Sequence, residues 1–156
     1  MNEFLSMGRL KHYLPATITM HTRTASTSLQ EPSLVAITAQ DNTIVAVGRE
    51  AENQKDFADV AVVSPLRNGA VADFERSCVL FSVLLRKVCK ISRLSFFSRP
   101  SVLISISDDQ TEVEERAMME AFARAGVNRV ELMFQPPGAD LKRLLEKFTV
   151  VVEITP

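Results

Sequence analysis

Apolar and polar residues follow two periodicities along this chain, one typical of strands and one typical of helices. Residues 16–28 alternate short polar and apolar side chains, which predicts an extended strand or a loose hairpin. Two β-branched runs, 34–38 and 43–47, are joined through Asp41 and Asn42, which adopt turn conformations readily. These two runs therefore predict a hairpin.

A short strand is expected at residues 60–63, after a polar stretch at 49–59 and before the breaking signals Pro65 and Gly69. The next segment, residues 76–91, carries apolar side chains on nearly every side of a helix, which is more than one surface stripe needs. We therefore predict a helix here that is largely buried.

The second half of the chain follows a strand-helix-strand pattern. The apolar run 102–106 is typical of a central parallel strand. Thr111 and Glu114 then form a capping box, in which each side chain satisfies a free amide at the start of a helix. Gly126 ends this helix. Its buried stripe is expected to contain Val113, Ala117, Met118, Ala121, Phe122 and Ala125.

A strand at residues 130–134, a short helix at 141–147 and a last β-branched strand at 149–154 complete the pattern. A hairpin-led sheet followed by strand-helix-strand crossovers is an α/β arrangement. The sequence therefore predicts a mixed sheet with flanking helices.

The last strand needs a pairing partner, because a free apolar edge templates aggregation. The short helix before it can return the strand to its own sheet, which we favour because the connection resembles the preceding crossover. Alternatively, two copies of the chain pair these strands across a symmetric dimer. The residues available for such an edge contact are Val150, Val151, Val152 and Ile154.

The length, charge balance and apolar content of the chain exclude several classes of function. A chain of 156 residues suits one domain with its own core. Its 18 basic and 19 acidic residues are balanced, so nothing favours a nucleic-acid partner. The longest apolar stretch, 79–85, falls far short of the roughly 20 residues of a membrane-spanning helix. The N-terminus offers no continuous apolar core for a signal peptide, so we expect a cytoplasmic protein.

The sequence predicts neither a metal site nor an internal disulfide. Cys78 and Cys89 lie eleven residues apart on one predicted helix, which separates them by roughly 16 Å and excludes a bond between them. His12 and His21 stand alone, without metal-ligand spacing. We interpret the acidic cluster as side chains that complement a helix N-terminus. Its members are Asp108, Asp109, Glu112, Glu114 and Glu115.

Five short runs match one known family in the right order. Residues 65–75 read PLRNGAVADFE and resemble the PLRDGVIADFE/D of MreB, the bacterial rod-shape actin. Residues 29–37 (LQEPSLVAI) are similar to its LNEPSVVAI, and residues 46–48 to its AVG. Downstream, residues 111–116 (TEVEER) and 124–126 match its TEVERR and RAG. The resemblance implies a ribonuclease H-like sheet that forms a single half-domain, the first half of an actin-like ATPase.

The resemblance also implies where ATP-binding residues should be. Actin-like ATPases hold the phosphates between two glycine-bearing turns, because only glycine lets backbone amides approach phosphate oxygens closely. Counted back from Glu31, the first turn (DLGTANT) falls on HYLPATI at residues 12–18, which has neither the aspartate nor the glycine. The second (VVDIGGGTT) begins at Val151 with Glu153 in place of the aspartate, and the chain ends at Pro156 before any glycine.

A third segment, residues 134–136, also lacks a residue that the family uses in ATP hydrolysis. Where the family has Glu-Glu-Pro, whose glutamate helps to position the attacking water, this chain has Phe134, Gln135 and Pro136. We therefore expect a noncatalytic relative of the first MreB domain, a pseudo-ATPase half that needs no cofactor. It would be an interaction module in cell-shape control that binds a protein partner, such as full-length MreB or another copy of itself. The alternative is a fragment or subunit of an ATP-dependent bacterial actin filament.

The loop at residues 94–100 offers a second kind of contact. It contains Leu94, Phe96, Phe97 and Arg99, and in MreB the same loop carries exposed apolar residues that enter the inner membrane. Two phenylalanines among cations suit an anchor at a lipid surface. The alternative, in which one or both rings fold back onto the core, is slightly favoured because large apolar side chains are usually buried.

Overall fold

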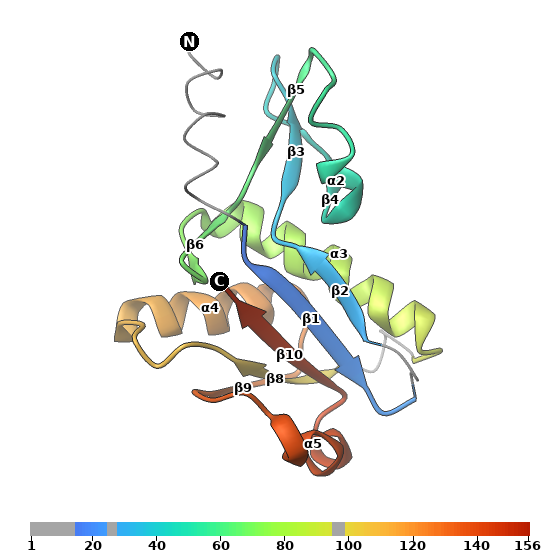
Figure 1. Ribbon diagram of the computed structural model, residues 1–156, viewed down its shortest axis with the longest axis vertical. Helices are drawn as coiled ribbons and strands as arrows, with labels where there is room; N and C mark the ends of the chain where they lie inside the picture. Colours follow the sequence, from blue (N-terminus) through green and yellow to red (C-terminus); the bar gives the residue numbers. More distant parts are fainter. Residues whose placement is uncertain (1–14, 25–27, 95–98) are drawn as a thin grey trace.

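Figure 1 presents the fold as a computed structural model, which describes residues 15–24, 28–94 and 99–156. Within these residues the largest sheet has five strands in the order β2-β1-β10-β8-β9. Its strands are β1 (Thr17–Thr22), β2 (Leu29–Pro32), β8 (Ser101–Ser105), β9 (Arg129–Met133) and β10 (Val150–Thr155). Strand β1 runs antiparallel to both of its neighbours, whereas β8, β9 and β10 are parallel to one another. The sheet is therefore mixed, as the sequence predicts.

The last strand of the chain lies in the middle of this sheet (Figure 1). On one side Val152 pairs with Met20 of β1, and on the other it pairs with Ile104 of β8. The strand thus returns to its own sheet, the alternative that the sequence analysis favours. Residues 150–152 have backbone partners on both sides, and Ile154 pairs with Ile18, so these residues present no free edge for a second copy.

Two helices cover one face of the large sheet, and a third lies against the other face (Figure 1). The first two are α3 (Phe74–Ile91) and α4 (Glu112–Arg124), and the third is α5 (Leu141–Lys147). Strand residues alternate between the two layers, because successive side chains of a strand point to opposite faces. Val150 and Val152 join the core beneath α3 and α4, whereas Val151 packs with Leu145 of α5.

The centre of the main core is an aromatic pair. Phe81 of α3 and Phe122 of α4 are both fully buried, and their ring centroids are 4.1 Å apart with 17° between the planes. A stacked pair of this kind adds a specific attraction to the burial of apolar area. It fixes how the two helices pack against each other.

Helix α3 begins two residues earlier than predicted. Asp73 is its N-cap, and its carboxylate accepts a hydrogen bond from the Arg76 amide at 3.1 Å. The expectation that this helix is largely buried is wrong for its outer side, where Val79 and Val83 are about 40% exposed (39% and 40%). The reason is that α3 packs against β1 and α4 on one side only, so a high apolar content did not require burial all round.

Half of the predicted capping box of α4 is present, since the Thr111 hydroxyl accepts a hydrogen bond from the Glu114 amide at 3.1 Å. The reciprocal bond to the Glu114 carboxylate is not found among the described residues. Val113 was expected in the buried stripe, and this prediction is wrong, because its side chain is 75% exposed. Positions four apart drift by about 40° around a helix. Val113 therefore points well away from the buried residues Ala121 and Ala125.

A smaller sheet in the order β4-β3-β5 stands at one end of the molecule (Figure 1). Its strands are β3 (Val35–Thr38), β4 (Ile44–Val47) and β5 (Val60–Val63), as the sequence analysis expects. Asn42 supplies the turn of the predicted hairpin with a φ of 57°. The polar stretch after the hairpin contains a helix that was not predicted, α2 (Arg49–Glu52), and a two-stranded hairpin, β6 (Leu66–Arg67) with β7 (Ala70–Val71), precedes α3.

A buried carboxylate joins the small sheet to the large one. The side chain of Glu31 on β2 is only 5% exposed and lies 3.5 Å from the Lys87 ammonium of α3. It also accepts a hydrogen bond of 3.0 Å from the Arg49 amide at the start of α2. Gly48 precedes that amide with a φ of 65°, and a Cβ added there would overlap the Glu31 carboxylate. This junction therefore requires glycine for two reasons.

Gly48→Ala is expected to lower the free energy of unfolding by about 2 to 3 kcal/mol, because it strains a left-handed residue and displaces a paired buried carboxylate. Urea denaturation of both proteins measures the difference. Gly138→Ala is the matched control, since Gly138 has a φ of 50° but nothing within 4 Å of an added Cβ. Equal losses in the two variants would show that the Glu31 contact contributes nothing.

Candidate functional site

The positions that the family resemblance assigns to nucleotide binding meet at one edge of the large sheet. Because β8, β9 and β10 are parallel, their carboxyl ends lie at the same edge, where α/β proteins usually bind ligands. Gln135 follows the end of β9. Thr155 ends β10 and pairs with Thr17, at the start of β1. Residues 12–14 of the first predicted turn lie outside the described residues.

Gln135 is held at this edge through its backbone. Its carbonyl accepts a hydrogen bond of 2.9 Å from the Ser105 hydroxyl at the end of β8. The side chains of Phe134, Gln135 and Pro136 are exposed. The sequence analysis matched Gln135 to a glutamate of the family, and a side-chain amide, unlike a carboxylate, cannot act as a base.

Glu153, which the sequence analysis matched to the aspartate of the second turn, makes a hydrogen bond across the sheet. Its carboxylate lies 2.5 Å from Nε2 of His21, and Nδ1 of the same ring lies 2.7 Å from the Ser28 hydroxyl. His21 belongs to β1 and Ser28 directly precedes β2. The sequence analysis treated His21 as isolated, and no periodic signal could have linked residues 132 positions apart.

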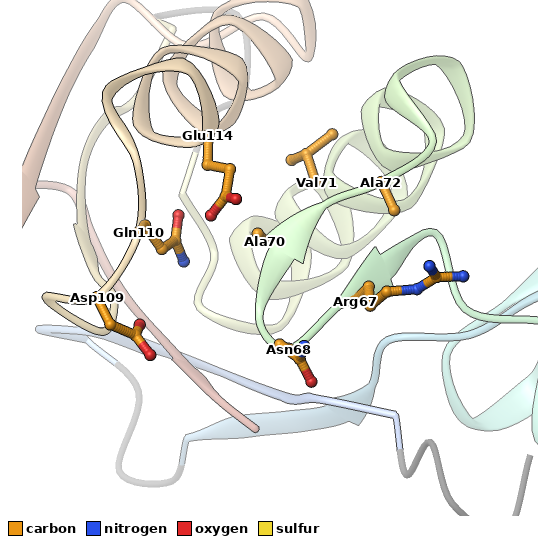
Figure 2. Close-up of a pocket in the computed structure, with 8 residues that line it drawn as sticks. All are labelled: Arg67, Asn68, Ala70, Val71, Ala72, Asp109, Gln110 and Glu114. Carbon is orange, nitrogen blue, oxygen red and sulfur yellow. The ribbon is translucent and has the colours of Figure 1, made fainter.

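A pocket of about 350 Å³ lies between the β6–β7 hairpin and the start of α4 (Figure 2). One wall comes from residues 67–72, within the family-like run 65–75, and the other from Asp109, Gln110 and Glu114, of which only Glu114 belongs to the family-like run 111–116. Figure 2 shows Glu114 and Gln110 extending into it from the α4 side, with Ala70 and Val71 opposite. The lining residues are Arg67, Asn68, Ala70, Val71, Ala72, Asp109, Gln110 and Glu114.

Gln110 ties the two walls together. Its side-chain amide nitrogen donates to the Gly69 carbonyl at 3.1 Å, and this fixes the orientation of the amide because a carbonyl can only accept. Its Oε1 atom is buried and has no hydrogen-bond partner among the described residues. Gly69 also lies near the end of β10, since a Cβ added there would be 3.9 Å from Ile154. The pocket therefore adjoins the carboxyl edge.

The residues predicted for membrane or partner contact are placed only in part. Leu94 is half-buried and packs against the main core, and Arg99 is exposed. Phe96 and Phe97 lie outside the described residues. No described helix has the length and apolar character needed to cross a bilayer.

The acidic cluster was assigned no metal in the sequence analysis. A search of residues 15–24, 28–94 and 99–156 finds no group of three His, Cys, Asp or Glu side chains arranged to hold a metal ion. Cys89 is buried and Cys78 half-buried, and both thiols are free. Burial raises the pKa of both, and the Glu75 carboxylate adds to the rise at Cys78, so neither favours the reactive thiolate.

The fold and the motifs agree with comparisons to known proteins. The sequence model of the family described as MreB/Mbl protein matches residues 15–154. The cell shape-determining protein Mbl of Bacillus cereus is 33% identical over 135 residues, which cover 85% of this chain and 40% of that protein. The chain therefore spans well under half the length of this relative.

Two solved structures share the fold. MreB5 of Spiroplasma citri bound to ADP has a TM-score of 0.62 and 22% identity, over 77% of this chain and 35% of that one. The MamK double helical filament has a TM-score of 0.57 and 14% identity, over 80% of this chain and 40% of that one. The fold is thus that of one half of an actin-like protein, and by sequence the chain belongs to the MreB/Mbl family.

Proposed function

We propose that this chain is a noncatalytic MreB-like module, cytoplasmic and without a cofactor, that takes part in cell-shape control by binding a protein partner. The observation that carries the proposal is the carboxyl edge of the large sheet. There Gln135 stands where the family's glutamate would be, and Glu153 is bonded to His21 at 2.5 Å. A carboxylate engaged in this way is not free to serve a nucleotide and its metal ion.

The backbone at the same edge supports the proposal. A phosphate-binding turn needs successive amides that leave the strand and point at the ligand. Thr155, two residues after Glu153, instead continues the ladder opposite Thr17. The proposal is therefore that this edge closes the sheet and does not bind phosphate.

The proposed partner is an actin-like protein of the same family, either a full-length MreB or a second copy of this chain. The outer side of α3 supports a contact of this kind, because Val79 and Val83 are exposed one turn apart. Exposed apolar side chains that form one stripe suit a protein partner better than isolated ones do.

Purified chain is expected to co-sediment with assembled filaments of a full-length MreB from the same cell. Val79→Lys/Val83→Lys should reduce the bound fraction at least tenfold, because two charges would enter an apolar contact. Val45→Lys is the matched control, since Val45 is also exposed but lies on the smaller sheet. A chain that stays in the supernatant at every filament concentration would contradict the proposal.

The same sedimentation assay with anionic vesicles tests a membrane contact through Leu94, Phe96, Phe97 and Arg99. If this loop is an anchor, the chain pellets with the vesicles, and Phe96→Ser/Phe97→Ser abolishes binding without lowering the melting temperature. A large drop in melting temperature with no vesicle binding in either protein would assign the rings to the core instead.

The second candidate function is a fragment or subunit of an ATP-dependent filament. It is favoured by one observation, that the chain covers 40% of the length of Mbl and 35% of MreB5. In that case the missing part would supply the rest of the nucleotide site. The two candidate functions make different predictions. A fragment of an ATP-dependent filament should bind ATP once a second half is present, whereas a noncatalytic module should not.

A further inference from the structure

The side chains of Ser28, His21 and Glu153 form a continuous series of hydrogen bonds on the large sheet. Ser28 lies 2.7 Å from Nδ1 of His21, and Nε2 of the same ring lies 2.5 Å from the Glu153 carboxylate. Cross-strand pairing sets this geometry, because β1 pairs with β10 on one side and with β2 on the other. Hydroxyl, imidazole and carboxylate in this order are the parts of an activated nucleophile.

The carboxylate determines which ring nitrogen carries the proton when the imidazole is neutral. An ionised carboxylate can only accept, so Nε2 must carry hydrogen toward Glu153. Nδ1 is then the lone-pair nitrogen, and the Ser28 hydroxyl donates to it. The ring is thus oriented as a base toward the hydroxyl, and the roles of the two nitrogens are fixed by their partners.

Ser28 is more exposed to solvent than His21 and Glu153. The side chain of His21 is 15% exposed and that of Glu153 is 24% exposed, so water competes weakly for their contact. Ser28 is exposed, and a reagent in solution can therefore reach its oxygen. His21, the base, and Glu153, which orients it, are thus largely shielded from water, whereas Ser28 is exposed to solvent.

We propose that Ser28 is a nucleophile that accepts an acyl group from small activated esters, with His21 as its general base and Glu153 as the residue that positions His21. In this step the Ser28 oxygen bonds to the carbonyl carbon of the ester, and the bond to the leaving alkoxide breaks. The hydroxyl proton passes to Nδ1 of His21 and from there to the leaving group, so that an acyl-serine and an alcohol result. The proposal uses the same contact of Glu153 with His21 as the proposed function, but it does not require that the chain bind a protein partner.

The competing explanation is that the three side chains only brace the strands. A bracing role predicts that Ser28 reacts no faster than other accessible serines. Ser107, which is half-buried, is the internal reference, because its hydroxyl donates to the Asp109 carboxylate at 2.6 Å and no described imidazole bonds to it. Comparing the two serines in one sample removes differences in reagent and folding.

The test is acetylation by p-nitrophenyl acetate at neutral pH, followed by peptide mass spectrometry over time. Ser28 is expected to be acetylated at least tenfold faster than Ser107, and more slowly in D₂O than in H₂O. His21→Gln should lower the Ser28 rate by about 100-fold, because a general base typically contributes this much. Glu153→Gln should lower it less, and Glu153→Asp should restore part of it.

Three results would overturn the proposal. The first is equal acetylation of Ser28 and Ser107 in the unaltered chain, which requires no variant to fold. The second is acetylation that stops on His21 itself. The third is a Ser28 rate that His21→Gln leaves unchanged while circular dichroism shows a folded protein.

Discussion

Phe122→Ala is expected to lower the free energy of unfolding by about 3 to 5 kcal/mol, the usual loss for truncating a deeply buried phenylalanine. Phe122 is fully buried and stacks on Phe81 at 4.1 Å between centroids. Truncation would leave a cavity at the contact of α3 and α4 and remove the aromatic attraction as well. Urea denaturation followed by circular dichroism measures the change.

Val113→Ala is the control, because Val113 is on the same helix and 75% exposed. Substitutions at such surface positions usually change stability by no more than about 0.5 kcal/mol. If both variants were destabilised equally, the packing of α4 described above would be incorrect.

Removing residues 149–156 is expected to abolish cooperative folding. The deletion takes out the strand between β1 and β8 and leaves both with unpaired backbone groups. It also removes Val150, Val152 and Ile154 from the main core. The truncated chain should be insoluble or molten, with strand signal but no sharp thermal transition.

A point substitution separates the strand's contribution from the effect of shortening the chain. Val152→Asp places a charge at a fully buried position, whereas Thr155→Asp places one at an exposed position of the same strand. Only the first should unfold the protein. A truncated chain that stays folded, monomeric and equally stable would show that β10 is not part of this sheet.

Local patterns predicted the elements well because their causes are local. The β-branched runs around Asn42 gave the hairpin, and Thr111 with its neighbours gave the start of α4. The four-residue helix α2 was missed, since it is too short to carry a period and begins at Gly48 without a side-chain cap. The exposure of Val83 on α3 was not predicted, because the number of apolar residues in a helix does not determine how many of its sides pack against other elements.

Long-range contacts could not be predicted from the pattern. The pairing of β10 with β1 joins the two ends of the described chain, and only the topology of the whole sheet determines it. The contact of His21 with Glu153 depends on that pairing. The pocket rests on a different long-range contact, the hydrogen bond from Gln110 to Gly69, which lie 41 positions apart. The family motifs identified residues 65–75 and 111–116 as similar to MreB, but they did not indicate that residues 67–72 and Glu114 line one pocket.

We propose that this half does not support nucleotide binding even when a second half is supplied. A chimera tests this proposal: the 77% of this chain that superimposes on MreB5 of Spiroplasma citri replaces the matching 35% of that protein, whose structures include one bound to AMPPNP. Calorimetric titration with magnesium and AMPPNP compares the chimera with unaltered MreB5, after circular dichroism shows that both are folded. We expect heat of binding from MreB5 and none from the chimera. Binding by the chimera with an affinity close to that of MreB5 would overturn this proposal and would favour the second candidate function, a fragment of an ATP-dependent filament.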